Sequence, residues 1–241
     1  MQQRIIDLAI AELENPTARV SRAHVAVIAG EGWHRGVIGI AASKISERVN
    51  RPCVVLSIEG DIAHGSARSI EPYHLLNGLT SCSDLFEKFG GHSHAAGVTI
   101  RRDRISELRR RLNEHAAACL TDEDLEPCLY IDGELPTADL TFDLVRELEM
   151  LEPYGAGNPR PVFLAHNLRI MSEPRLIGEK HIKMHVSGPG GRPLEAIWWN
   201  GAEIGQTVAV TNGITMAYTI ETARWGGETF LQLCVQELRS D

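Results

Sequence analysis

The apolar pattern of the chain changes character near residue 121. Up to residue 120, segments with the two-residue period of strands alternate with segments that have the 3.6-residue period of helices. From residue 161 onward only strand-like segments remain, separated by Gly, Pro or Asn turns. The stretch between them is acidic and contains four prolines. The sequence therefore predicts an α/β domain over residues 1–121, a linker over 122–160 and an all-β barrel over 161–241.

The α/β part begins with an amphipathic leading helix over residues 1–14. A Val-rich strand at 24–29, a helix at 37–49 and a buried strand at 53–58 come next, which is typical of a βαβ unit on a parallel or mixed sheet. The remaining elements expected here are an extended segment at 64–69, a helix at 72–82 opened by Pro72, a loop at 89–97, a strand at 98–101 and a helix at 103–120.

The linker contains one short expected helix, at residues 142–151. Beyond it, strands are expected at 162–170, 181–187, 194–199, 207–210, 214–222 and 229–238. Five or six short strands in about 80 residues indicate a small barrel. The OB-fold is one such barrel, and it often binds single-stranded nucleic acid.

The net charge of −8 argues at first against a nucleic-acid partner, but it is unevenly distributed. Residues 121–160 carry −9, whereas residues 1–120 carry +2 and residues 161–241 carry −1. Local basic surfaces are therefore compatible with the composition. The five cysteines include no C-x-x-C pair, which favours free thiols and a reducing cytoplasm. No apolar run approaches the ~20 residues of a membrane span.

The first candidate site lies where the first strand gives way to a helix and contains Trp33, His34, Arg35 and Gly36. Unpaired backbone N–H groups at a helix start attract an anion, and Arg35 adds a positive charge. The alternative is an ordinary strand-to-helix loop in which glycines permit a tight turn. No Gly-Lys-Ser/Thr follows, so the segment is not a P-loop.

The second candidate site is the extended segment around Ser66, Arg68 and Ser69. Ser66 and Arg68 point to the same face of a strand, because side chains alternate with period two. A hydroxyl and a guanidinium on one face can clamp a phosphate. The alternative is a surface strand with a solvated arginine.

The third candidate site contains Gly90, Gly91 and His92. Adjacent glycines let the backbone approach a ligand closely, and His92 is placed to contact a phosphate. A metal site made by His92 and His94 is disfavoured, because no Asp, Glu or Cys cluster accompanies the pair.

In the barrel, Trp225, Trp199 and Tyr218 are candidates for stacking on bases, with a place in the core as the alternative for each. Trp199 and its neighbour Trp198 must face opposite sides of a strand, so one of them belongs to the core. The arginine-rich run at 101–111 is interpreted as a solvated helix face.

Four segments in this order resemble the RecJ family of exonucleases over the whole chain. They are G-W-H-x-G-V-I-G-I at 32–40, G-S-x-R-S-I at 65–70, F-G-G-H-x-x-A-A-G at 89–97 and P-[FY]-G-x-G-N-P-x-P at 153–161. The third marks a wider group of phosphoesterases with a DHH-associated domain. The fourth, followed by a β-barrel, is similar to RecJ itself.

The resemblance implies 5′-to-3′ degradation of single-stranded DNA by a divided enzyme. An upstream DHH domain would hold Mn²⁺ or Mg²⁺ and cleave the strand, and the OB-fold would hold that strand. The DHH-associated domain would grip phosphates through His34, Ser66, Arg68, Gly91 and His92. The chain contains no Asp-His-His triplet, so no catalytic residue or metal ligand is assigned to it.

The partners implied are single-stranded DNA, the upstream DHH domain and a single-strand-binding protein or helicase. Two alternatives remain: a DHH-family phosphodiesterase of small nucleotides, and a stand-alone single-strand-binding module. The barrel argues against the first, because a dinucleotide needs no track for a long strand.

Overall fold

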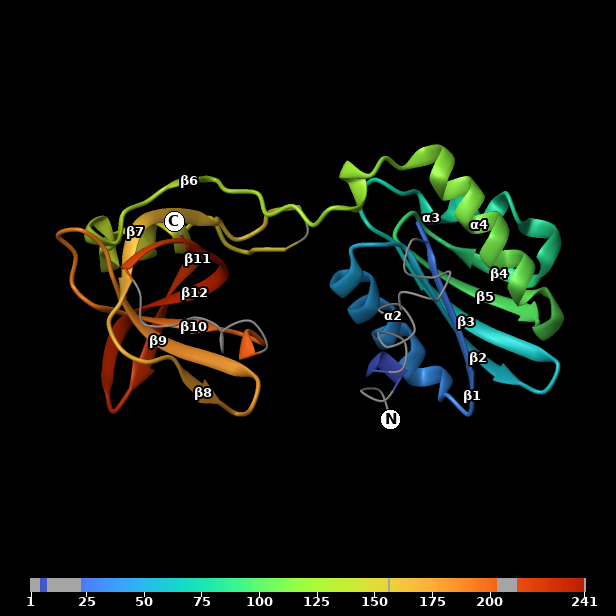
Figure 1. Ribbon diagram of the computed structural model, residues 1–241, viewed down its shortest axis with the longest axis horizontal. Coiled ribbons are helices and arrows are strands. Elements are labelled where there is room, and N and C mark those ends of the chain that lie inside the picture. Colours follow the sequence, from blue (N-terminus) through green and yellow to red (C-terminus); the bar gives the residue numbers. More distant parts are fainter. Residues whose placement is uncertain (1–4, 8–22, 156, 203–211, 241) are drawn as a thin grey trace. The chain divides into compact units, whose positions relative to one another are not determined.

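The computed structural model describes residues 5–7, 23–155, 157–202 and 212–240. The chain divides into two compact units, Met1–Cys128 and Leu129–Asp241 (Figure 1). Within the leading helix expected over residues 1–14, residues 5–7 are helical and Ile5 and Ile6 are buried. The rest of that segment lies outside the described residues.

The first unit is an α/β domain with a mixed sheet, as expected. Its five strands follow the order β1-β2-β3-β5-β4, with β1 and β2 parallel and the other neighbours antiparallel. The βαβ unit is therefore confirmed. The elements are β1 (Ala26–Glu31), α2 (Arg35–Val49), β2 (Cys53–Glu59), β3 (Ile62–Arg68), α3 (Leu75–Thr80), β4 (Phe86–Gly91), β5 (Ala95–Arg101) and α4 (Ile105–Cys119).

Helices cover the two faces of this sheet unequally. α2 lies on one face, where Ile38 and Ile45 pack with Cys53 and Val55 of β2. α3 and α4 lie on the other face, over the core that contains Leu56 (Figure 1). The alternation of side chains along β2 thus separates two apolar layers. Burial at the α2 layer raises the pKa of the Cys53 thiol to about 12.

Helix α3 begins later than the sequence pattern indicated. Pro72 lies in the turn ahead of the helix, and His74 caps it by accepting a hydrogen bond from the Asn77 N–H at 3.3 Å. The Leu75 N–H donates to the Ser93 carbonyl, at 2.9 Å, which ties the helix start to a neighbouring turn. A tertiary hydrogen bond and a side-chain cap therefore set this boundary.

The segment 89–97 is a β-hairpin, so the expectation of a loop is wrong. Gly90 pairs with Gly97 and Gly91 with Ala96, and the turn itself occupies residues 92–94. A Cβ on Gly91 would lie 2.3 Å from the Ala95 carbonyl oxygen, and its φ is +155°. The glycines thus allow two backbones to pair closely, which turn-like composition alone does not reveal.

Part of the stretch expected as a linker packs into the second unit. β6 (Gly133–Glu134) pairs parallel to β7, and α5 (Phe142–Glu149) buries Val145. Leu140 is also buried in the same core, and the Tyr218 hydroxyl donates to the Leu135 carbonyl at 2.5 Å. The apolar residues of this acidic stretch are sparse but sufficient to hold it on the barrel.

The second unit is a seven-stranded sheet that closes on itself, resembling an OB-fold barrel as expected. Its order is β6-β7-β11-β12-β10-β9-β8, and an additional pairing of β7 with β9 closes the ring. The strands are β7 (Phe163–Ile170), β8 (Arg175–Ile177), β9 (His181–Ser187), β10 (Leu194–Trp198), β11 (Asn212–Trp225) and β12 (Glu228–Ser240). The strand expected at 207–210 lies outside the described residues.

Side chains alternate between the inside and outside of the barrel. On β9, for instance, Ile182, Met184 and Val186 are buried inside, whereas Lys183 and His185 point outward. The outer face therefore carries polar side chains over a closed apolar core.

Candidate nucleic-acid interface

Among the described residues, α2 covers only part of the sheet face on which it lies. α2 packs over β2 and β3. Ala63 and Ala67 of β3 point into the core on the other face, so the alternate residues His64, Ser66 and Arg68 face α2. An open groove of about 610 Å³ lies along this face. Its principal lining residues are Arg35, Gly36 and Gly39 of α2, His64, Ser66 and Arg68 of β3, Lys88 and Gly90 of β4, and Gly97 and Thr99 of β5.

Three sequence motifs that are far apart along the chain meet in this groove. The first contributes Arg35 and Gly36, the second Ser66 and Arg68, and the third Gly90. The sheet order explains the convergence, because β3 is paired to β5 and β5 to β4, while α2 lies beside β3. Residues from each of the three predicted sites therefore lie on one surface.

The Arg68 guanidinium is held over the floor of the groove by three hydrogen bonds. Nε donates to the Ser43 Oγ at 3.0 Å, and Nη1 donates to the Ser66 Oγ at 3.1 Å and to the Ala67 carbonyl at 2.9 Å. A Cβ added to Gly39 would lie 3.5 Å from Nη2. In the described part of the chain, Arg68 has no carboxylate partner. Its charge is thus oriented but not neutralised.

Arg35 also lines the groove, but it is already paired with an acid. Its Nε and Nη2 donate to the two Glu59 carboxylate oxygens at 2.8 and 2.5 Å. These hydrogen bonds lower the pKa of the Glu59 carboxyl and raise the pKa of Arg35. A phosphate would therefore have to compete with Glu59 for this guanidinium.

Trp33 and His34 do not line the groove and have local roles. A Cβ on Gly30 would lie 2.4 Å from the Trp33 ring, so that ring packs closely on the strand. The His34 Nδ1 accepts from the Gly36 N–H at 3.0 Å, and its carbonyl accepts from the Val37 N–H. The expectation of unpaired N–H groups at this helix start is thus wrong for Gly36 and Val37, because His34 caps them.

Ser69, Gly91 and His92 lie beyond the groove lining. The Ser69 hydroxyl donates to the Tyr73 carbonyl at 2.6 Å, and its N–H donates to the His94 carbonyl at 3.0 Å. The contact with His94 anchors the hairpin turn that presents the exposed His92. Ser69 and Gly91 thus position the backbone of this region, whereas the His92 side chain is accessible to solvent.

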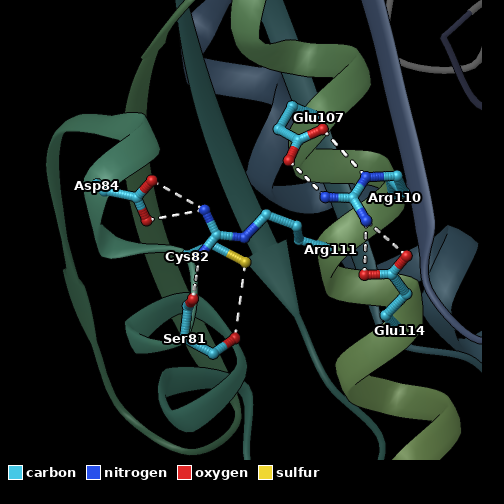
Figure 2. A network of polar contacts seen from close by, with 7 residues as sticks. All are labelled: Ser81, Cys82, Asp84, Glu107, Arg110, Arg111 and Glu114. Carbon is cyan, nitrogen blue, oxygen red and sulfur yellow. Dashed lines mark hydrogen bonds and ion pairs between the residues drawn. The ribbon is translucent and has the colours of Figure 1, made fainter.

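The arginine-rich run of α4 is engaged with acids of its own domain. Figure 2 shows Arg110 between Glu107 and Glu114, with ion pairs of 2.6 Å to each. Arg111 contacts Asp84 at 2.8 Å and also the Ser81 carbonyl. Figure 2 also shows the contact between the Ser81 hydroxyl and the Cys82 Sγ. This run lies on α4, which packs on the face of the sheet opposite the groove.

A second groove, of about 770 Å³, crosses the outer face of the barrel from β9 to the β11–β12 hairpin. Trp225 stands at the hairpin tip and is 83% exposed. The aromatic side chains of the groove are Phe142, Trp225 and Phe230, and its basic ones are Lys183, His185, Arg192 and Arg224. Cations beside aromatic faces are the combination that binds single strands.

Two carboxylates line the barrel groove, those of Glu195 and Glu228, and the Glu195 carboxylate is engaged. The Gln232 Nε2 donates to the Glu195 Oε1 at 2.6 Å, and Lys183 forms an ion pair with the same carboxylate. This negative charge is thus partly neutralised beneath the surface.

Of the other barrel aromatics, Tyr218 is fully buried and Trp199 is half exposed. Burial raises the pKa of the Tyr218 hydroxyl, which donates to the Leu135 carbonyl. Base stacking by Tyr218 does not fit this burial, and its place is in the core. Trp199 contacts the edge of His181, with ring centroids 4.8 Å apart, while Trp198 is in the core.

Sequence reasoning missed His64 and Lys88, which line the groove, and Ser43, which holds the Arg68 guanidinium. His64 shares the two-residue period of Ser66 and Arg68, and that period could have revealed it. Lys88 was hidden because the segment after it was interpreted as a loop, which left its strand register undefined. Ser43 is placed by the packing of α2 on β3, which no local pattern encodes.

Among the described residues, no three His, Cys, Asp or Glu side chains come together as metal ligands, so these residues do not fit the divalent metal that the family resemblance implies. No described helix is long and apolar enough to cross a membrane.

Comparisons with known proteins agree with this arrangement. Family models for the DHHA1 domain and the RecJ OB domain match residues 21–118 and 131–237. The single-stranded-DNA-specific exonuclease RecJ of Bacillus subtilis is 35% identical over 215 residues, which cover 88% of this chain and 27% of that protein. The Escherichia coli protein of the same name is 32% identical, over 86% of this chain and 36% of that protein.

A solved structure is similar in fold along the whole chain. RecJ from Thermus thermophilus, in complex with Mg²⁺, matches with a TM-score of 0.75 and 26% identity, covering all of this chain and 36% of that one. A second structure of that protein holds Mn²⁺. The chain thus spans about a third of the length of these relatives.

Proposed function

Since the chain belongs to the RecJ family by its DHHA1 and RecJ OB domains, we propose that it is the substrate-binding part of a 5′-to-3′ exonuclease for single-stranded DNA. The observation that carries the proposal is the convergence of three separate motifs on one groove with an unneutralised Arg68. The proposed partner in that groove is the phosphate backbone at the 5′ end of the strand.

The groove suits a phosphate for reasons of charge and shape. Arg68 offers a planar fork whose orientation is fixed, and Ser66 places a hydroxyl beside it. Gly97 and Gly90 leave the floor without side chains, so the backbone of a strand can lie close to the sheet. His92 adds an exposed donor on the turn that follows β4.

The barrel groove would hold the strand farther along. Its aromatic side chains can stack on bases without regard to sequence, while Arg192 and Arg224 attract the backbone. Trp225 is the foremost stacking candidate because of its exposure, followed by Trp199. A second groove, on the barrel, favours a polynucleotide over a dinucleotide, which is why a phosphodiesterase of small nucleotides is the weaker candidate.

The chemical step is assigned to a DHH domain outside this chain. Structures of a relative contain Mg²⁺ or Mn²⁺, and such ions activate water for phosphodiester cleavage. The residues of this chain would orient the strand toward that centre. A single-strand-binding protein or a helicase is proposed as the supplier of unpaired DNA. The five free cysteines favour the reducing cytoplasm.

Binding of labelled oligonucleotides tests this function directly. We expect the chain to bind single-stranded DNA more tightly than duplex DNA or a dinucleotide, with affinity falling as salt rises because counterions are released. Fluorescence anisotropy at several salt concentrations measures both effects. A Trp225→Ala variant should bind the single strand more weakly without a change in Tm. Equal affinity for all three ligands, independent of salt, would overturn the proposal.

A further inference from the structure

The open sheet face is organised in rows of residues that run across β3, β5 and β4. Ser66 is paired with Gly97, and Gly97 with Gly90. His64 is paired with Thr99, and Thr99 with Lys88. All six residues line the same groove. The two rows are neighbours on one face, so about 7 Å separates them along the strands.

The two rows differ in chemistry. The Ser66 row carries only one hydroxyl and two glycines, and the Arg68 guanidinium bends over it to reach the Ser66 Oγ at 3.1 Å. The His64 row carries three polar side chains, one of them the ammonium of Lys88. Positively charged side chains therefore lie over both rows, Arg68 over the first and Lys88 in the second. The two glycines leave the floor of the groove between them without side chains.

Lys88 resembles Arg68 in having no carboxylate partner in the described part of the chain. The other cation of the groove, Arg35, is paired with Glu59. The His64 Nδ1 and the Thr99 Oγ1 lie 3.4 Å apart, which fixes the imidazole beside the threonine. An accessible ammonium, an oriented imidazole and a hydroxyl are together a donor set for an anion.

We propose that His64, Thr99 and Lys88 form a second phosphate subsite, which holds the phosphate that follows the 5′ phosphate clamped by Ser66 and Arg68. The inference rests on the proposed function of the first subsite, and it adds the residues that would contact the next phosphodiester linkage. The spacing of the rows is of the order that separates consecutive phosphates in an extended strand. The subsite would select strands that enter the groove stretched along the sheet.

The test pairs a change in the DNA with a change in the protein. The probe is a 5′-phosphorylated oligothymidylate in which the first internucleotide linkage is a neutral methylphosphonate, compared with the unmodified strand. With the unaltered chain, we expect the neutral linkage to weaken binding about tenfold, which corresponds to about 1.4 kcal/mol. With Lys88→Gln, binding of the unmodified strand should be weaker and the neutral linkage should no longer matter.

Three variants make the result specific. Lys88→Arg should keep the response to the neutral linkage, because it keeps the charge. Arg110→Gln, on the opposite face of the sheet, should behave as the unaltered chain does. Arg68→Ala should abolish the response to the 5′ phosphate while the response to the linkage persists.

The outcomes separate the two proposals. If Lys88→Gln responds to the neutral linkage as strongly as the unaltered chain, the second subsite is refuted. If removal of the 5′ phosphate has no effect on the unaltered chain, the first clamp fails instead. Lys88 is exposed, so the variant is not expected to disturb folding, and a circular dichroism melt checks that point.

Discussion

The Arg68 guanidinium has a fixed orientation and no carboxylate partner among the described residues. Replacing it therefore tests the phosphate clamp directly. A charge-assisted contact to a phosphate contributes about 1–3 kcal/mol. Arg68→Ala should therefore weaken binding of a 5′-phosphorylated strand tenfold or more, at ~1.4 kcal/mol per decade. Arg68→Lys should restore only part of the affinity, because an ammonium cannot donate as a fork. Titration by fluorescence anisotropy measures the difference.

The matched control for this prediction is Arg110→Ala. Arg110 is also an arginine of the first unit, but it is paired with Glu107 and Glu114. It should change affinity little, whether or not the strand carries a 5′ phosphate. Equal losses from Arg68→Ala and Arg110→Ala would mean that Arg68 is only one more surface charge.

Glu59 holds the second guanidinium of the groove and should oppose binding. Glu59→Gln removes the negative charge that pairs with Arg35 and releases Arg35 for a phosphate. We expect the affinity for single-stranded DNA to rise a few-fold and the salt dependence to become steeper. In the Arg35→Ala background the same change should have a smaller effect. Glu107→Gln, which breaks a pair on α4, is the control and should leave affinity unchanged.

Single residues were also where sequence reasoning differed most from the structure. The period-two pattern placed Ser66 and Arg68 on one face correctly, because strand alternation is a local property. It could not show that Glu59 engages Arg35, since that pair joins residues 24 positions apart. Tyr218 was equally ambiguous, because a strand tyrosine can face either side of a barrel and its hydroxyl partner, Leu135, is distant in sequence.

At the scale of elements, α2 forms the wall of the groove through Gly39. A methyl group at this position would lie 3.3 Å from the Ser66 Oγ and 3.5 Å from the Arg68 Nη2. Gly39→Ala should therefore weaken binding of a 5′-phosphorylated strand. Its Tm should not fall, because alanine favours a helix interior by about 0.5–1 kcal/mol over glycine. An unphosphorylated strand serves as the internal comparison, and an equal loss for both strands would contradict the assignment.

The sequence located most elements, and its errors share a cause. Strong periodicity marked α2, β9 and α4 well. The hairpin of β4 and β5 was missed because Gly90, Gly91 and Gly97 read as a loop, although they serve close strand pairing. The start of α3 was misplaced because a hydrogen bond from a distant turn fixes it. Local composition identifies elements, whereas tertiary contacts set such boundaries.

At the scale of the whole molecule, the proposed binding surfaces lie in both units, and no catalytic centre is assigned to this chain. We expect the purified chain alone to show no nuclease activity with Mn²⁺ or Mg²⁺, since its sequence has no Asp-His-His triplet. Incubation with an end-labelled single strand, followed by gel analysis, measures this. When the chain is combined with a DHH domain, we expect it to lower the KM of that enzyme for the single strand. Robust metal-dependent digestion by the chain alone would contradict the assignment of catalysis to a separate DHH domain.

The closure of the barrel has a consequence for how the second unit moves. β11 and β12 are paired along nearly their full length, whereas in the described residues β7 and β9 are joined through Arg169–Ser187 and Ile170–Val186. Amide protons at this short seam should exchange with solvent sooner than those of the long hairpin, because fewer bonds must break together. We therefore expect the β7–β9 pairing to open first on heating, while the β11–β12 hairpin that carries Trp225 stays paired.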